Sequence, residues 1–205
     1  MRISSTPKES ACVDKTTLRA TLPLSAKRIA SAEFAASPQA LTLVSLQSHH
    51  GKAAALAGAV RQQCGVDLPG PGRWVGGRWV GGQAVTVSWG GHEQWFISTQ
   101  TDEPYPFTQR MSEALGHCAA ITDQSDAWAR IKLRGPACYT VLERLCPLDL
   151  HPSVFPPGHV ARTVMAHLGV QIMAISGEPE FVFLTPSSSA QSFWTTLEQA
   201  AASGF

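Results

Sequence analysis

A short motif, Cys-x-x-Asp-Leu, occurs twice in the chain, and the sequence pattern around it repeats as well. The two copies lie 82 positions apart and consist of Cys64, Asp67 and Leu68 in the first and Cys146, Asp149 and Leu150 in the second. Farther along the chain, Phe107 precedes Phe193 by 86 positions. In both copies an apolar helical segment leads into the motif and a loop follows it. A chain that repeats its pattern in this way is expected to fold as two similar units.

The segments around each copy of the motif indicate helices among strands. The first unit is expected to contain, in order, a strand over residues 41–47, a helix over 51–64, strands over 83–89 and 92–99, a helix over 104–115 and a strand over 117–125. The second is expected to contain a strand over residues 127–135, a helix over 136–146, strands over 159–176 and 178–186, and a helix over 189–202. The predicted fold is therefore α+β, with two pseudo-repeated β-α-β-β-α units of mainly antiparallel strands over residues 41–125 and 126–205.

The first forty residues differ from the rest of the chain. They are rich in Ser, Thr, Ala and Lys or Arg, and their few apolar residues keep no sustained period. We expect residues 1–40 to form a flexible N-terminal arm that gains contacts only on a partner. The basic, hydroxyl-rich composition is also typical of a mitochondrial presequence, although Glu9 and Asp14 interrupt it.

The composition is that of an ordinary soluble protein, with 44% hydrophobic and 15% charged residues. A formal net charge of +1 provides no long-range field that would attract nucleic acid or an anionic membrane, so we expect neither as a partner. No stretch approaches the roughly 20 apolar residues that cross a bilayer, and the N-terminus lacks the apolar core of a secretory signal. The five cysteines are widely spaced and form no CxxC pair, which favours reduced thiols and a cytoplasmic location.

Residues 145–159, LCPLDLHPSVFPPGH, place a thiol, a carboxylate and two imidazoles close together in sequence. A zinc site needs four ligands at tight local spacing, whereas seven residues, three of them proline, separate His151 from His159. A Cys–His dyad stays open, because the fold decides whether the two groups meet. On the structural interpretation, Cys146 packs under the loop as an inert thiol and Asp149 accepts hydrogen bonds from loop amides. We therefore assign no catalytic and no metal-binding residue.

Residues 69–83, PGPGRWVGGRWVGGQ, contain a tandem copy of GRWVG. The segment lacks the Gly-Lys-Ser/Thr of a phosphate-binding loop and the three spaced glycines of a dinucleotide fingerprint, and it leads into a strand rather than a helix. We therefore assign no cofactor-binding residue to it. Trp74 and Trp79, each preceded by an arginine, indicate a mobile loop whose amphipathic side chains suit a protein interface. The alternative is a duplication in a solvent loop with no such role.

Three segments of the chain resemble the gamma subunit of heterotetrameric sarcosine oxidase: ITDQS, the run ARIKLRGPACYTVLERLCPLDLHPSVFPPGHVARTVMAHLGVQIM, and SFWTTLEQAA. The resemblance extends over about residues 40–203 and is most specific from Cys146 to His167. The N-terminal arm and the GRWVG duplication have no counterpart in it. It implies a fold similar to the folate-binding domain of the glycine-cleavage aminomethyltransferase.

The resemblance implies a noncatalytic subunit of a flavoenzyme complex. The complex would oxidise sarcosine to glycine and formaldehyde, or to 5,10-methylenetetrahydrofolate, with hydrogen peroxide as the other product. The implied partners are alpha, beta and delta subunits, on which FAD, FMN, NAD and tetrahydrofolate are expected; none of these is expected on this chain. The alternative is a stand-alone folate-binding or one-carbon-transfer protein of the aminomethyltransferase type, although no residue here matches that enzyme's folate-binding carboxylate.

The proline-rich loop and the two tryptophans form the candidate partner interface, which consists of His151, Val154, Phe155, Pro156, Pro157, His159, Trp74 and Trp79. Prolines restrict the free loop, so less conformational entropy is lost when a partner binds it. An apolar pair such as Val154 and Phe155 on a stiff loop is typical of an interface anchor. The alternative is that Phe155 folds back and covers its own unit.

Overall fold

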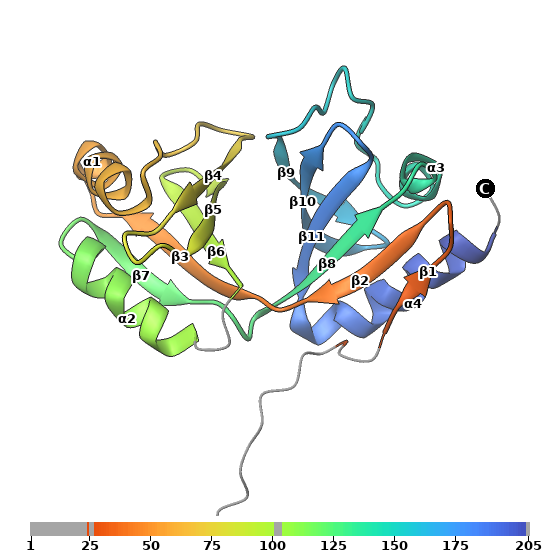
Figure 1. Ribbon diagram of the computed structural model, residues 1–205, viewed down its shortest axis with the longest axis horizontal. Helices are drawn as coiled ribbons and strands as arrows, with labels where there is room; N and C mark the ends of the chain where they lie inside the picture. The colour runs from red at the N-terminus through yellow and green to blue at the C-terminus, as the bar shows by residue number, and fades with distance from the viewer. Residues whose placement is uncertain (1–23, 25–26, 101–103, 204–205) are drawn as a thin grey trace, which may run out of the picture.

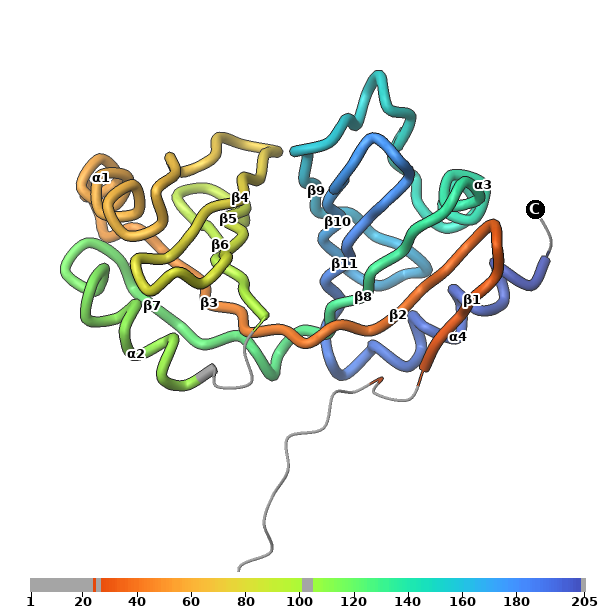
Figure 2. Tube along the Cα trace, in the orientation of Figure 1, coloured from red at the N-terminus to blue at the C-terminus, as the bar shows by residue number. Residues whose placement is uncertain are grey.

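The computed structural model describes residue 24 and residues 27–100 and 104–203, which form two halves lying side by side (Figures 1 and 2). Each half contains one sheet, and every strand pair in both sheets is antiparallel. The predicted α+β class with mainly antiparallel sheets is thereby confirmed. None of the described helices is long and apolar enough to span a membrane.

The first half contains a five-stranded sheet in the order β4-β5-β6-β3-β7. Its elements are β3 (Thr42–Ser48), α1 (Ala53–Cys64), β4 (Trp74–Arg78), β5 (Ala84–Gly91), β6 (Gln94–Thr99), α2 (Pro104–Leu115) and β7 (Ala119–Asp123). Apolar side chains of α1 and α2 pack on one face of this sheet, where Val60 and Phe107 share a core with Ile97. Helix α1 ends at Gly65, whose left-handed φ of 69° suits glycine and lets its N–H reach the Arg61 carbonyl.

The second half contains a six-stranded sheet in the order β1-β2-β8-β11-β10-β9. Its elements are β1 (Ile29–Ala30), β2 (Ala35–Gln39), β8 (Trp128–Arg134), α3 (Cys138–Glu143), β9 (Val160–Met165), β10 (Leu168–Ser176), β11 (Glu180–Pro186), the 3-10 turn η1 (Ser187–Ser189) and α4 (Ala190–Ala202). Helices α3 and α4 cover its outer face, where Val141 and Phe193 share a core with Phe183. Helix α3 is shorter than the expected 136–146, because the chain tightens into a turn in which the N–H groups of Leu145 and Cys146 both bond to one carbonyl, that of Leu142.

The prediction of a flexible arm through residue 40 is wrong for Ala35–Gln39, which form β2. This strand pairs with β8 from Ala35↔Arg134 to Gln39↔Arg130. Strand β1 pairs only with Ala35 and Ala36, so no described strand lies beside Pro38 on the outer edge of β2. A sheet tolerates proline at such a position. The composition of these residues is that of a tail, and the strand that stabilises them, β8, lies far away in the sequence. Residues 1–23 and 25–26 of the expected arm lie outside the described residues.

The expected mobile loop at the GRWVG duplication is also corrected. Trp74–Arg78 form β4, which pairs with β5 from Trp74↔Ser88 to Arg78↔Ala84. Gly77 lies close to the Cys64 carbonyl and the Val66 side chain, so a Cβ there would be only 2.7 Å from that carbonyl oxygen. Gly77 of the duplication is therefore required for packing, because a larger residue at this position of β4 would collide with its neighbours.

The inner faces of the two sheets pack against each other. Leu43 and Phe96 of the first sheet meet Met173, Val182 and Leu184 of the second in a third apolar cluster. The chain crosses between the halves twice, from β2 to β3 and from β7 to β8, and the two crossings run side by side (Figure 1). They are joined where the Gln124 N–H donates to the Leu43 carbonyl at 2.7 Å and the Leu43 N–H donates to Ser125 Oγ at 3.1 Å.

Candidate functional site

The proline-rich loop lies between α3 and β9 at the top of the molecule in Figure 1. It is anchored below by Cys146 and Leu150, which are both buried in the second core. Beyond Leu150 the chain emerges, and most of the residues before β9 are exposed or half-buried. The loop therefore projects from a fixed base in the core.

Asp149 and His151 give the loop its shape through local hydrogen bonds. Asp149 Oδ1 accepts the His151 N–H at 2.9 Å, as predicted for the carboxylate of the motif. The His151 carbonyl then accepts the N–H groups of Val154 and Phe155, each at 2.8 Å. The imidazole Nδ1 of His151 lies 2.7 Å from Ser153 Oγ. These polar groups stabilise one loop conformation.

Val154 and Phe155 are adjacent, but they face different environments. The Val154 side chain is 55% exposed. The Phe155 ring is half-buried against the second core and lies 5.6 Å from the His159 ring. The structure thus supports the alternative interpretation for Phe155, in which the ring covers its own unit, and leaves Val154 as the apolar side chain presented to solvent.

The base of the loop is tied to the first half through β4. The Trp74 N–H donates to the Gly158 carbonyl and the Val160 N–H donates to the Gly72 carbonyl, both at 2.9 Å. His159 Nδ1 lies 2.8 Å from Arg73 Nη1 and also 2.8 Å from the Pro156 carbonyl. A guanidinium only donates, so Nδ1 must offer its lone pair to Arg73 or its proton to the carbonyl, not both. The glycine-rich segment therefore positions the loop.

The two tryptophans of the predicted interface are engaged inside the chain. Trp74 is half-buried, and its indole N–H donates to the Ala174 carbonyl at 2.8 Å. Trp79 is 5% exposed and packs edge-on against Phe107 in the first core, with ring centroids 5.7 Å apart. The prediction that Trp79 contacts a partner is wrong, because its side chain is part of the first core. Trp79 lies directly after β4, and its backbone N–H donates to the Gln83 carbonyl at 2.8 Å.

A pocket of about 360 Å³ opens beside the first residues of the loop. Its lining comes from the loop and from α3, and comprises Tyr139, Glu143, Leu148, Asp149, Leu150, His151 and Pro152. Of these, only His151 was predicted as an interface residue. Tyr139 on α3 was not predicted because no sequence pattern shows which side of a short helix stays uncovered, and Leu148, which follows the helix, carries no signal in the sequence either.

Cys146 is 7% exposed, so the prediction of a buried thiol is confirmed. Burial raises the pKa of Cys146, and a hydrogen bond from the Leu148 backbone offsets part of the rise. A raised pKa lowers the fraction of thiolate, which is the nucleophilic form. The described part of the chain contains no group of three or more His, Cys, Asp or Glu side chains placed to hold a metal ion.

Three comparisons relate the chain to known proteins. The family model described as "Sarcosine oxidase, gamma subunit family" matches residues 50–203. A curated relative, sarcosine oxidase subunit gamma from Corynebacterium sp. (strain U-96), is 29% identical over 136 residues, which are 66% of this chain and 62% of the relative. The match thus spans less than two thirds of that relative's length.

The fold is shared with two solved structures. A chain of heterotetrameric sarcosine oxidase from Corynebacterium sp. U-96, in complex with pyrrole 2-carboxylate, superposes with a TM-score of 0.73 at 24% identity, covering 90% of this chain and 95% of that chain. Aminomethyltransferase T of the glycine cleavage system from Bartonella henselae gives a TM-score of 0.65 at 12% identity, covering 81% of this chain and 45% of that chain. The resemblance in fold expected from the sequence is confirmed.

Proposed function

The chain belongs to the sarcosine oxidase gamma subunit family, and from this premise we propose that it is a noncatalytic subunit of a heterotetrameric sarcosine oxidase. The observation that carries the proposal is the family match over residues 50–203, which includes the motif copies of both halves. The complex would oxidise sarcosine to glycine and formaldehyde, or to 5,10-methylenetetrahydrofolate, with hydrogen peroxide as the other product. The partners would be alpha, beta and delta subunits, which would hold FAD, FMN, NAD and tetrahydrofolate.

The geometry of the loop supports a structural role for its polar residues. Asp149 and His151 are occupied in fixing the turn at the start of the loop. His159 is occupied at its base, with Nδ1 bonded to either Arg73 or the Pro156 carbonyl. Groups used in this way shape a surface, and the reactive groups of the oxidation would be those of cofactors on the larger subunits.

We place the docking surface on the exposed side of residues 151–157, with Val154 as its apolar contact and the adjacent pocket as a receptor for a partner side chain. The Asp149 and His151 hydrogen bonds preorganise this surface, so a partner would bind it without ordering a flexible segment. An apolar side chain surrounded by proline and polar residues fits the usual arrangement of an interface contact with a polar rim.

The cytoplasm would be the site of assembly. Cys64, Cys118, Cys138 and Cys146 are all buried and unpaired with one another. Thiols in this state are typical of proteins in a reducing compartment.

The test is a pair of matched substitutions, Val154→Asp and Val80→Asp. Val80 is 67% exposed and follows β4 in the first half, so it provides the same chemical change at similar exposure away from the loop. A buried, unpaired carboxylate at an interface is costly, so Val154→Asp should weaken assembly by about tenfold or more. Val80→Asp should leave assembly unchanged, and neither substitution should alter the melting temperature of the isolated chain by more than a few degrees.

Co-purification of subunits, followed by titration of the chain into the remaining complex, measures these affinities. Equal effects of the two substitutions would place the docking surface elsewhere. Oxidase activity or a flavin spectrum in the isolated chain would overturn the noncatalytic role. Tight stoichiometric binding of 5-formyltetrahydrofolate by the isolated chain would instead support the stand-alone folate-binding alternative.

A further inference from the structure

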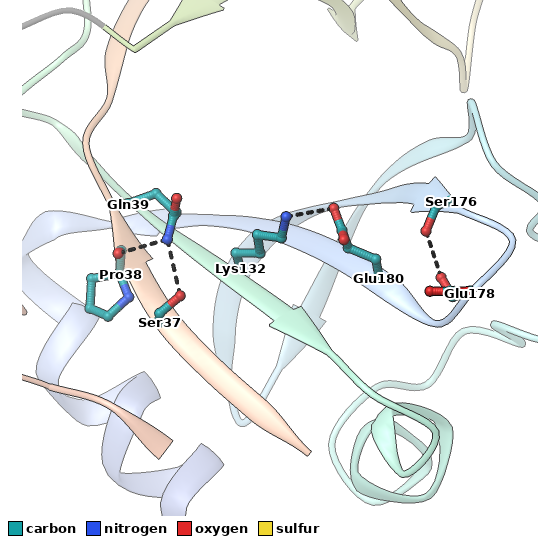
Figure 3. A network of polar contacts seen from close by, with 7 residues as sticks. All are labelled: Ser37, Pro38, Gln39, Lys132, Ser176, Glu178 and Glu180. Atoms are coloured by element: carbon teal, nitrogen blue, oxygen red, sulfur yellow. Dashed lines mark hydrogen bonds and ion pairs between the residues drawn. The ribbon is translucent and has the colours of Figure 1, made fainter. Parts of the chain in front are cut away.

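Strand β8 presents basic side chains on the face of its sheet that is turned toward the first half. Ile131 and Leu133 point to the second core on the outer face, so Arg130 and Lys132, at alternate positions, point the opposite way. Lys132 has a carboxylate partner, because its Nζ lies 2.8 Å from Glu180 Oε1 (Figure 3). The two neighbouring cations therefore differ in how their charge is compensated.

Arg130 forms no ion pair within the described residues. Its register partners on either side are Gln39 of β2 and Leu184 of β11, neither of which is acidic. The amide nitrogen of Gln39 is directed to Ser37 Oγ and the Pro38 carbonyl, each at 3.0 Å (Figure 3). The Nε atom of Arg130 is buried and has no hydrogen-bond partner in the described part of the chain. Desolvation by burial lowers the pKa of this guanidinium.

Arg130 lines a pocket of about 370 Å³ between the two halves. The opposite side of the pocket is formed by β5 and β6, where Thr86 and Ser98 are direct neighbours across the two strands. Direct partners in an antiparallel pair project on the same face, so their hydroxyl groups lie close together. Gln83 and Gln100 also line this pocket, and no described Asp or Glu does. Arg130 is its one charged lining residue among those described.

We propose that this pocket binds a small organic carboxylate, with the Arg130 guanidinium as its charge partner and the Thr86 and Ser98 hydroxyls as hydrogen-bond donors. A guanidinium presents parallel N–H groups that match the two oxygens of a carboxylate. A buried charge without a partner is costly, and the attraction between opposite charges is stronger where water is largely excluded. A carboxylate in the pocket would therefore give the buried Arg130 Nε–H an acceptor that it lacks among the described residues.

The volume of the pocket indicates how large the bound anion is. It lies near the lower end of the roughly 300–1,000 Å³ typical of ligand pockets, and it is many times the ~30 Å³ that a single water occupies in the liquid. A halide ion would leave most of it unfilled. The ligand is therefore a carboxylate with several carbon atoms, either a free small molecule or an Asp or Glu side chain of a partner subunit.

The first experiment titrates the full chain with succinate and, at matched ionic strength, with sodium chloride. Proton–nitrogen correlation NMR follows the Arg130 Nε–H signal directly. Succinate should shift this signal to saturation, and chloride should not. Arg130→Gln should weaken succinate binding, measured by calorimetry, by about tenfold or more, as expected for loss of a bidentate charged pair.

Lys132→Gln is the matched control, since it removes the same charge from the same strand two positions away, outside this pocket. It should change succinate affinity by less than about twofold, in line with screened interactions between separated charges. Ser98→Ala and Thr86→Val, which keep the charge of Arg130, test the hydroxyl donors if Arg130→Gln fails to fold. Each should weaken binding measurably.

The second experiment distinguishes the two sources of the carboxylate. If a partner side chain occupies the pocket, Arg130→Gln should weaken subunit assembly, Lys132→Gln should not, and succinate should compete with assembly. If a free molecule occupies it, succinate should bind the isolated chain and the complex equally. The titration of the isolated chain does not depend on the proposed subunit role. The proposal is overturned if succinate and chloride act alike, or if Arg130→Gln changes neither succinate affinity nor assembly.

Discussion

The two copies of the Cys-x-x-Asp-Leu motif keep one residue in the same role and use another differently. Cys64 and Cys146 are each buried in the core of their own half. Asp67 forms an ion pair with Arg61 of the preceding helix α1, whereas Asp149 accepts the N–H of His151 in the loop that follows. The thiol therefore serves the fold in both halves, and the carboxylate serves the loop in only one.

The helices that lead into the two motifs also differ. Helix α1 has 12 residues and ends at a left-handed glycine, whereas α3 has 6 and ends at Arg144 in a right-handed conformation. The first half continues into β4, which is paired within its sheet. The second half continues into an exposed loop. The two halves thus differ at the ends of these helices and in the segments that follow them.

The largest expected effect tests whether the two cores are equivalent. Phe107 and Phe193 occupy corresponding positions, and each packs against another aromatic ring, Trp79 and Phe183 respectively. Replacing either with Ala should lower the free energy of unfolding by about 3–5 kcal/mol, because a large cavity forms in a packed core. Urea denaturation of both variants measures this. A cost below about 1 kcal/mol for one of them would contradict the equivalence of the halves.

An intermediate effect concerns the two thiols at alkaline pH. Burial raises the pKa of Cys64 from 9.0 to about 11. The unfolded chain then loses this proton at lower pH than the folded chain, so the stability is fully present below pH 9 and is lost as the pH rises toward about 11. The loss should be on the order of 2 kcal/mol.

Denaturation across this pH range in the wild type, Cys64→Ala and Cys146→Ala measures the thiol contributions. Removal of Cys64 should flatten the alkaline decline. Removal of Cys146 should flatten it less, because the hydrogen bond from the Leu148 backbone favours its thiolate. A larger effect at Cys146 would reverse the comparison and mark that thiol as the more strongly desolvated one.

The smallest expected effect separates the two carboxylates. Asp149→Ala should cost about 0.5–1.5 kcal/mol through the lost bond to the His151 amide. It should also speed hydrogen exchange at the amides of Val154 and Phe155, which bond to the His151 carbonyl. Asp67→Ala removes an exposed ion pair and should change stability by less than about 0.5 kcal/mol. Similar exchange rates in the loop of both variants would show that Asp149 does not shape it.

The sequence predicted an element correctly where the local pattern of apolar residues agrees with their burial in the fold. The strand over residues 41–47 corresponds to β3, which is a short run buried on both faces. The closing helix over 189–202 corresponds to α4, which carries a regular apolar face. The burial of Cys146 followed from the apolar helix that precedes it. Each of these depends on residues close together in the chain.

The sequence was insufficient where the partner is distant or the side chain is deceptive. Residues 35–39 have the composition of a tail. They form a strand only because they pair with β8, which follows the whole first half in the sequence. Trp79 looks like a loop residue among glycines, but Phe107 and the first core enclose it. The sequence did not single out Arg130, since a basic residue on a strand is ordinary until its register partners are known to be the uncharged Gln39 and Leu184.

The position of β2 has a consequence for the order in which the protein takes shape during synthesis. This strand leaves the ribosome before the entire first half, yet its partner β8 is made only after that half is finished. The first half contains all of its own strands and is free to fold as it emerges. Until β8 is made, the edge of β2 that pairs with it is unpaired, and the other edge of β2 is paired with β1 only at Ala35 and Ala36; its shortness and Pro38 protect it from intermolecular pairing. Completion of the second sheet is thus necessarily a late, nonlocal event in the life of each new chain.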